Sequence, residues 1–100
     1  MTEKKSQQIN IHLGEEGGQG NYSNISIITF SPSEFIIDFA TMLPGLTQAE
    51  VKSRVILTPE NAKRLMLTLQ ENVSRYESNV APINVQRKLN IEPFGGKGNA

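Results

Sequence analysis

Few residues of this 100-residue chain have the type and spacing of a catalytic site. The single histidine, His12, lies where polar and apolar residues alternate, on the polar side of that alternation. A solvated surface position is the expected role for such a residue. General-base catalysis would need a partner such as a serine or aspartate within hydrogen-bond reach, and the neighbouring sequence places none there. We therefore expect no histidine-based chemistry.

A glycine-rich segment at residues 14–20 holds the next candidates, Glu15 and Glu16. A phosphate cradle needs a helix after the glycines and usually a lysine, and two carboxylates would repel a phosphate group. Four glycines in seven positions without an apolar side chain are typical of a flexible connection. We interpret the segment in that way, and we predict no metal or cofactor site in it.

Two further carboxylates, Glu34 and Asp38, have the spacing of an acid–base pair. A simpler interpretation gives Glu34 to a turn and pairs Asp38 with Arg54 on a neighbouring strand, since opposite charges across an antiparallel pair stabilise a sheet. The chain contains no cysteine, which excludes disulfides, thiolate nucleophiles and thiolate metal sites. The sequence thus predicts no catalytic residue, no cofactor and no enzyme.

The charge balance and the hydropathy of the chain bear on whether it binds nucleic acid or a membrane. Ten Lys and Arg residues balance ten Asp and Glu residues, so no net field steers the chain toward nucleic acid. Nucleic-acid binding is the second alternative function, and it would require six basic residues to converge on one face: Lys52, Arg54, Lys63, Arg64, Arg87 and Lys88. No signal peptide and no apolar run of membrane-spanning length is present, so we expect a bacterial cytoplasmic protein without a membrane partner.

Alternating apolar residues indicate strands at residues 8–13, 22–30, 35–43 and 51–57. The third is ambiguous, because Ser31, Pro32 and Glu34 also form a capping box that would begin a helix over residues 32–43. The density of β-branched and aromatic residues favours the strand. In the hairpin that results, Phe35, Ile37 and Phe39 face Leu57, Val55 and Ser53 on the inner side, and Asp38 faces Arg54 on the outer side.

A long amphipathic helix is predicted from Pro59 to residues 78–79. Thr58 is its N-cap, and Pro59 occupies the first helical position. Apolar residues then recur at spacings of three and four: Ala62, Leu65, Met66, Leu69, Val73 and Tyr76. The predicted fold is α+β, a four-stranded antiparallel meander with this C-terminal helix packed on one face. We expect a single domain over residues 7–79, between a disordered N-terminus at residues 1–6 and a flexible C-terminal arm.

That arm covers residues 80–100. Residues 84–91 alternate in a way that allows an added strand, so the arm is either disordered or docks on this chain, a neighbour or a partner. The other surface to explain is the outer sheet face, which one helix cannot cover. We therefore predict a homo-oligomer, a dimer, in which sheet faces or edges pack together. The candidate interface consists of Ile36, Asp38, Ala40, Met42, Arg54 and Ile56.

Three blocks of the sequence, at residues 21–24, 31–39 and 54–65, resemble the bacterial and archaeal family catalogued as domain of unknown function 3467. The likeness spans residues 8–78, and the family offers no catalytic residues to carry across. The order of strands and helix is also similar to that of SecB-like export chaperones, which associate through their sheets. This second likeness is one of fold alone.

These observations favour a homo-oligomeric binding or adaptor module that contacts protein through a sheet face, a sheet edge or the C-terminal arm. The first alternative is a small-ligand or enzymatic site at a subunit interface, assembled from Asp38, Arg54 and Tyr22.

Overall fold

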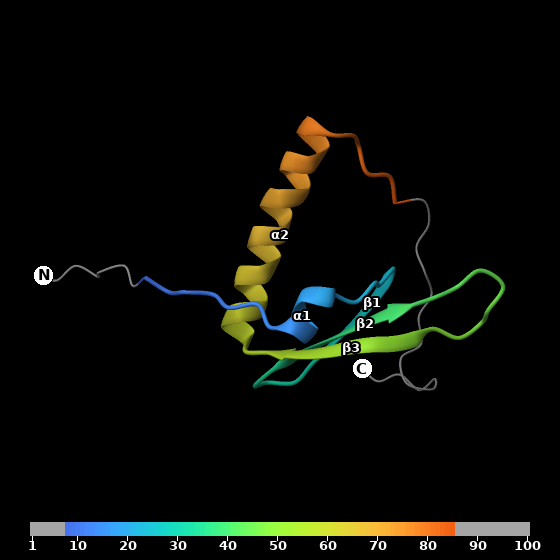
Figure 1. Ribbon diagram of the computed structural model, residues 1–100, viewed down its shortest axis with the longest axis horizontal. Helices are drawn as coiled ribbons and strands as arrows, with labels where there is room; N and C mark the ends of the chain where they lie inside the picture. Colours follow the sequence, from blue (N-terminus) through green and yellow to red (C-terminus); the bar gives the residue numbers. More distant parts are fainter. Residues whose placement is uncertain (1–7, 86–100) are drawn as a thin grey trace, which may run out of the picture.

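The computed structural model describes residues 8–85, which form a three-stranded antiparallel sheet and two helices (Figure 1). The order along the chain is α1 (Glu15–Gln19), β1 (Ile25–Phe30), β2 (Phe35–Thr41), β3 (Glu50–Leu57) and α2 (Pro59–Asn79). The strands lie in sequence order, with β2 in the centre. The α+β class is confirmed, and the ambiguous segment after Pro32 is a strand.

The predicted hairpin register is also confirmed. Phe35 lies opposite Leu57, Ile37 opposite Val55, and Asp38 opposite Arg54. A β-bulge then shifts the register between Phe39 and Ala40. Val51 pairs with Ala40 there, and Lys52 is left as the extra residue. Because a one-residue insertion reverses the alternation, Val51 changes to the opposite sheet face from Val55.

The sequence predicted four strands, and the prediction of a strand at residues 8–13 is wrong for the single chain. These residues form no strand, and Ile9, Ile11 and Leu13 are exposed to solvent. A period-two pattern becomes a strand only where a neighbouring strand supplies hydrogen bonds, and in the described part of the chain β1 and β3 pair with β2 alone.

The glycine-rich segment also differs from its prediction, because it contains the five-residue helix α1. Glu15 and Glu16 lie in the first turn, where the helix dipole favours negative charge. The Gly18 N–H donates to the Gly14 carbonyl at 2.8 Å. Leu13 lies over the glycines, its side chain 3.6 Å from where a Cβ on Gly17 would be.

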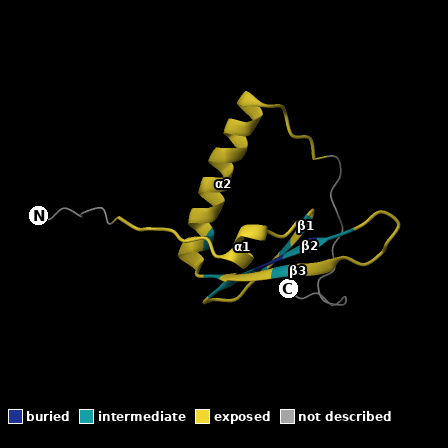
Figure 2. Cartoon of the chain, in the orientation of Figure 1, coloured by how far each residue is buried: buried dark blue, intermediate teal, exposed yellow. Residues whose placement is uncertain are grey.

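The buried core of the described residues is confined to β2 (Figure 2). Ile37 is buried on one sheet face, and Asp38 and Ala40 are buried on the other. Asp38 was expected on an outer, uncovered side. It is buried because it lies on the central strand, between Ile27 and the side chain of Arg54.

Helix α2 begins and ends where the sequence predicts. The Thr58 hydroxyl accepts a hydrogen bond from the Asn61 N–H at 3.1 Å, as an N-cap should. The helix does not pack on the sheet, however, and none of its residues is buried. Only Thr58 separates Leu57 from Pro59, which leaves no room for a reverse turn that would bring α2 back across the strands. Figure 1 shows the helix rising away from the end of β3.

The remaining predictions concern the ends of the chain. Residues 81–85 have no regular structure. Residues 1–6, which were predicted to be disordered, and most of residues 84–91, predicted as a possible strand, lie outside the described residues. The single domain over residues 7–79 stays a prediction. Among the described helices, none has the length and apolar character needed to cross a membrane.

Candidate interaction surface

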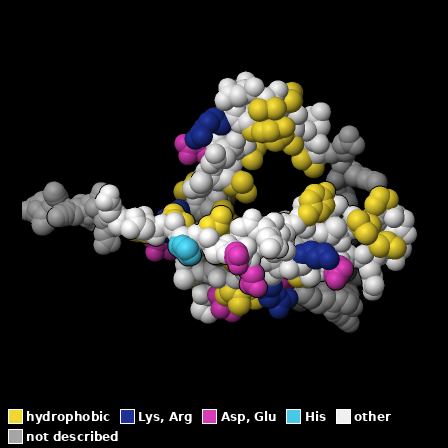
Figure 3. Space-filling model, viewed as in Figure 1, with side chains coloured by type: hydrophobic (Ala, Val, Ile, Leu, Met, Phe, Trp, Pro, Cys, Tyr) yellow, Lys and Arg dark blue, Asp and Glu magenta, His cyan; other side chains and the backbone are white. Residues whose placement is uncertain are grey.

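The apolar side of α2 is not covered by any other part of the described chain. We call its six residues the α2 stripe: Ala62, Leu65, Met66, Leu69, Val73 and Tyr76. The five large ones are 38–55% exposed. Figure 3 shows hydrophobic side chains on the side of the helix that borders the open space beside it, with charged side chains on the opposite side. An amphipathic helix is stable when such a stripe is covered, and the described chain leaves it in solvent.

The sheet presents a second, largely apolar surface. Directly paired residues share a face, so the register defines an apolar sheet face made of Ser26, Ile28, Phe30, Phe35, Ile37, Phe39, Thr41, Glu50, Ser53, Val55 and Leu57. Ile28 and Phe30 are 59% and 74% exposed at its β1 edge. The rings of Phe30 and Phe35 lie with centroids 5.6 Å apart. Seven of these eleven residues are apolar, and the one charged residue, Glu50, lies at the end of the face beside the loop between β2 and β3.

The opposite sheet face carries an ion pair at its centre. Arg54 Nε donates to Asp38 Oδ1 at 2.7 Å, and Arg54 Nη2 donates to Oδ2 at 3.0 Å, which is a bidentate pair. The Asp38 side chain is 1% exposed and that of Arg54 is 50% exposed. The hydrogen bond to Asp38, together with the attraction of its charge, raises the pKa of Arg54.

That ion-pair face contains most of the predicted interface. Ile36 and Ile56 lie beside the pair, and Ile56 is exposed. Asp38 and Ala40 are already buried within the single chain. Met42 lies just beyond β2 and is half-buried. The structure therefore brings five of the six residues onto one sheet face, and Ile56 offers a partner more surface than Asp38 or Ala40.

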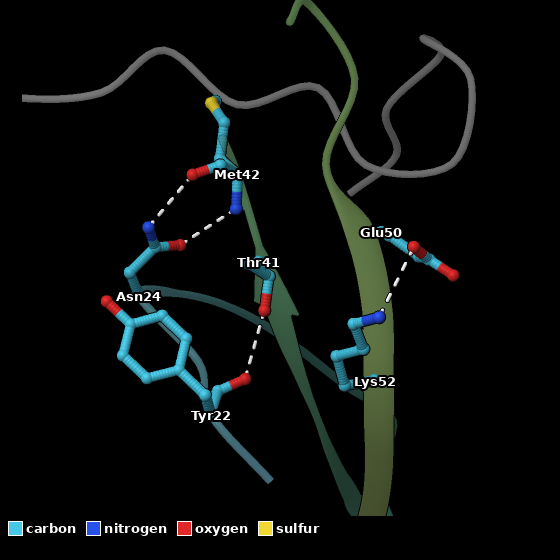
Figure 4. Close-up of polar contacts among 6 residues, drawn as sticks. All are labelled: Tyr22, Asn24, Thr41, Met42, Glu50 and Lys52. Atoms are coloured by element: carbon cyan, nitrogen blue, oxygen red, sulfur yellow. Dashed lines mark hydrogen bonds and ion pairs between the residues drawn. The ribbon is translucent and has the colours of Figure 1, made fainter. Parts of the chain in front are cut away.

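Asn24 has a structural role that the sequence analysis did not identify (Figure 4). Its side-chain amide donates to the Met42 carbonyl at 2.9 Å and accepts from the Met42 N–H at 2.8 Å. The Thr41 hydroxyl donates to the Tyr22 carbonyl at 2.9 Å. These bonds extend the β1–β2 pairing past Ile25 and leave the Tyr22 ring exposed. An asparagine just before a strand was the available signal.

The alternative active site is not assembled in this chain. Tyr22 reaches the sheet through its backbone at Thr41, whereas Asp38 and Arg54 bond to each other. His12 is exposed, and no group of metal-binding side chains occurs among residues 8–85. Within one chain, therefore, Tyr22 and the Asp38–Arg54 pair are held by separate contacts.

A shallow pocket of about 500 Å³ borders the loop between β2 and β3. Its lining residues are Thr41, Leu43, Leu46, Thr47, Gln48, Ala49, Glu50 and Lys52. Its two charged residues, Glu50 and Lys52, pair with each other at 3.3 Å and are exposed (Figure 4). A ligand site usually offers a few convergent polar groups shielded from water, which this pocket lacks.

Of the six basic residues named for nucleic-acid binding, three have acidic partners in the described part, and Lys63 is exposed on α2. Lys52, Arg54 and Arg64 are each paired with an acidic residue. Arg87 and Lys88 lie outside the described residues. Neutralised cations contribute little to phosphate binding, so these pairs weigh against the nucleic-acid alternative.

Comparison with known families gives one match. The family model described as protein of unknown function (DUF3467) matches residues 1–85, and the chain belongs to this family. This confirms the resemblance found in the sequence. No curated protein and no solved structure matches the chain.

Proposed function

We propose that this member of the DUF3467 family is a homo-oligomeric protein-binding module and not an enzyme. The observation that carries the proposal is that α2, with 21 residues, has no buried residue although it carries a continuous apolar stripe. Burying apolar surface is the main driving force of association, and a helix of this kind needs a partner to cover it. A dimer is the simplest assembly that provides one.

The chemistry of the exposed groups supports binding over catalysis. The described chain exposes large apolar side chains on α2 and on β1, and no group of side chains able to hold a metal ion occurs among residues 8–85. Asp38, its one buried charged residue, is held by Arg54. Large exposed apolar patches mark protein contacts more often than reaction sites.

The proposal is tested by the oligomeric state of the full chain in sedimentation velocity. We expect a dimer at micromolar concentrations, and we expect Leu69→Gln to dissociate it. Leu67→Gln is the matched control, because Leu67 has nearly the same exposure as Leu69, 51% against 55%, but lies on the other side of the helix. A monomeric wild-type chain at tens of micromolar would contradict the proposal.

Binding of a further protein is a second step of the same function. Pull-down of the full chain and of a chain lacking residues 80–100 compares the two surfaces available for it, the sheet and the C-terminal arm. We expect a specific partner that survives high salt, since apolar contacts are not screened. Equal capture by the truncated chain would assign the contact to the sheet and α2.

A further inference from the structure

The α2 stripe and the apolar sheet face have matching properties, yet they do not cover each other within one chain. The α2 stripe has no charged residue, the apolar sheet face has one, Glu50, at its end, and each surface has large side chains in solvent. The single residue Thr58 between β3 and α2 keeps the two surfaces of one chain apart. A second copy has no such restraint, so its helix can approach the sheet from any direction.

The dimensions of the two surfaces agree. At about 1.5 Å per residue, the α2 stripe from Ala62 to Tyr76 spans roughly 22 Å. The apolar sheet face runs along the seven residues of β2, roughly 23 Å at about 3.3 Å each, and three strands about 4.8 Å apart form a surface wide enough for one helix. One helix therefore covers one apolar sheet face.

The exposed apolar area of the two surfaces can be compared with what a stable dimer buries. Eight of the large exposed apolar side chains lie on these surfaces, with exposures of 38–74%: Leu65, Met66, Leu69, Val73, Tyr76, Ile28, Phe30 and Val55. A fully exposed side chain of this kind offers roughly 60–120 Å², so the eight expose on the order of 400 Å² per chain. A stable interface buries about 800 Å² per partner, of which somewhat more than half is apolar, so the two surfaces supply most of the apolar part.

The charges on α2 favour a protein partner over a lipid surface. Three basic and three acidic residues lie off the stripe: Glu60, Lys63, Arg64, Glu71, Arg75 and Glu77. Helices that lie on anionic membranes have polar sides rich in Lys and Arg. The balanced charge of α2 lacks this attraction, whereas it suits the solvent side of a helix packed on protein.

From this complementarity we infer that α2 of each chain lies on the apolar sheet face of a second copy, in a two-fold symmetric dimer. Each helix supplies the cover that the other chain's sheet lacks, and each contact occurs twice, as two-fold symmetry requires. The sequence predicted that the chain's own helix covers this sheet face, whereas in the dimer the helix comes from the partner. This inference rests on the proposed function and specifies its interface.

The arrangement is tested by isotope-filtered NMR on a dimer made from one labelled and one unlabelled copy. Only contacts between chains appear in such a spectrum. We expect methyl contacts from Leu69 and Val73 of one chain to Ile28 and Val55 of the other. Leu67, on the opposite side of the helix, should show none. The dissociation constant should rise at least tenfold for Leu69→Gln and for Phe30→Gln, and less than twofold for Leu67→Gln.

Each outcome has a distinct meaning. A dimer whose α2 methyls contact only the partner's α2, or whose affinity is unchanged by Phe30→Gln, would overturn the arrangement and leave the proposed function standing. A monomer would overturn both. A monomer that also floats with anionic phospholipid vesicles would assign the stripe to a membrane surface instead.

Discussion

Among the described ion pairs, the one between Asp38 and Arg54 is expected to contribute most to the stability of the fold. The carboxylate is almost fully buried, and both of its oxygens accept from the same guanidinium. Asp38→Asn keeps the shape but removes the charge and one of the two matched acceptors. We expect the free energy of unfolding in urea to fall by about 1–3 kcal/mol, the range for hydrogen bonds between charged groups.

The surface pair between Glu60 and Arg64 is the control. Arg64 Nη2 lies 2.8 Å from Glu60 Oε2, nearly as close as the atoms of the buried pair, but both side chains are more than 60% exposed. Glu60→Gln should therefore lower the free energy of unfolding by less than about 1 kcal/mol. Equal losses for Asp38→Asn and Glu60→Gln would show that burial does not make the Asp38 pair more stabilising than a surface pair.

The ion pair also makes stability depend on pH at the alkaline end. Because folding raises the pKa of Arg54, the stability that this residue contributes is complete below its ordinary pKa and is lost only at higher, strongly alkaline pH.

Asn24 makes a second residue-scale prediction. Its side chain imitates a paired strand residue by bonding to both the N–H and the carbonyl of Met42. Asn24→Ala removes two hydrogen bonds, each worth about 0.5–1.5 kcal/mol, so we expect a loss of about 1–3 kcal/mol in urea unfolding. Asn72→Ala is the matched control, because Asn72 makes one exposed hydrogen bond to Thr68 within α2. If Asn24→Ala lowered the free energy of unfolding no more than Asn72→Ala, the two hydrogen bonds from Asn24 to Met42, which we call the Asn24 clamp, would not stabilise the sheet.

At the scale of elements, the sequence predicted what local interactions determine. The cap at Thr58, the end of α2 and the strand after Pro32 depend on neighbouring residues. The register of β2 on β3 followed from a charge pair, Asp38 with Arg54. Within the candidate surface, the α2 stripe and the alternation of β2 were predictable from periodicity for the same reason.

What the sequence did not predict depends on distant neighbours. Periodicity shows that α2 has an apolar side, but not which surface covers it, and the short connection at Thr58 decides that its own sheet does not. The bulge at Lys52 and the Asn24 clamp depend on the backbone of β2, which no spacing in β3 or β1 reveals. Residues 8–13 failed as a strand because alternation does not supply a pairing partner.

Residues 8–13 carry the element-scale prediction. The outer edge of β1 (Ile25–Phe30) has no charged residue and no proline, whereas the edge of β3 has Lys52 and Arg54. Sheet edges without such protection attract another strand. We expect residues 8–13 to become the fourth strand on β1 when the oligomer forms. Hydrogen exchange at Ile9 and Ile11 should slow in the wild-type oligomer and stay fast in Leu69→Gln.

Fast exchange at Ile9 and Ile11 in a stable oligomer would contradict this prediction. Residues 81–83 are an internal control, because they are exposed, lack regular structure and lie outside the segment at residues 84–91 that could add a strand. Slowing in both segments would indicate general compaction. Slowing in residues 8–13 alone would indicate that the predicted four-stranded sheet exists in the assembled protein.

At the scale of the whole molecule, folding and association should be one process. The buried core of the described chain contains only Ile37, Asp38 and Ala40, which is little for a chain of 100 residues to offset its conformational entropy.

If the apolar surface of a second copy supplies the rest of the core, the melting temperature must depend on protein concentration. We expect calorimetry to show a rise of about 3–4 °C for each tenfold increase, from the unfolding entropy of two such chains. Leu69→Gln, which weakens the dimer, should melt at a lower temperature than the wild type at every concentration, while Leu67→Gln should follow the wild type. A concentration-independent wild-type melting temperature would mean that one chain folds alone, and that the exposed stripe of α2 contributes nothing to its stability.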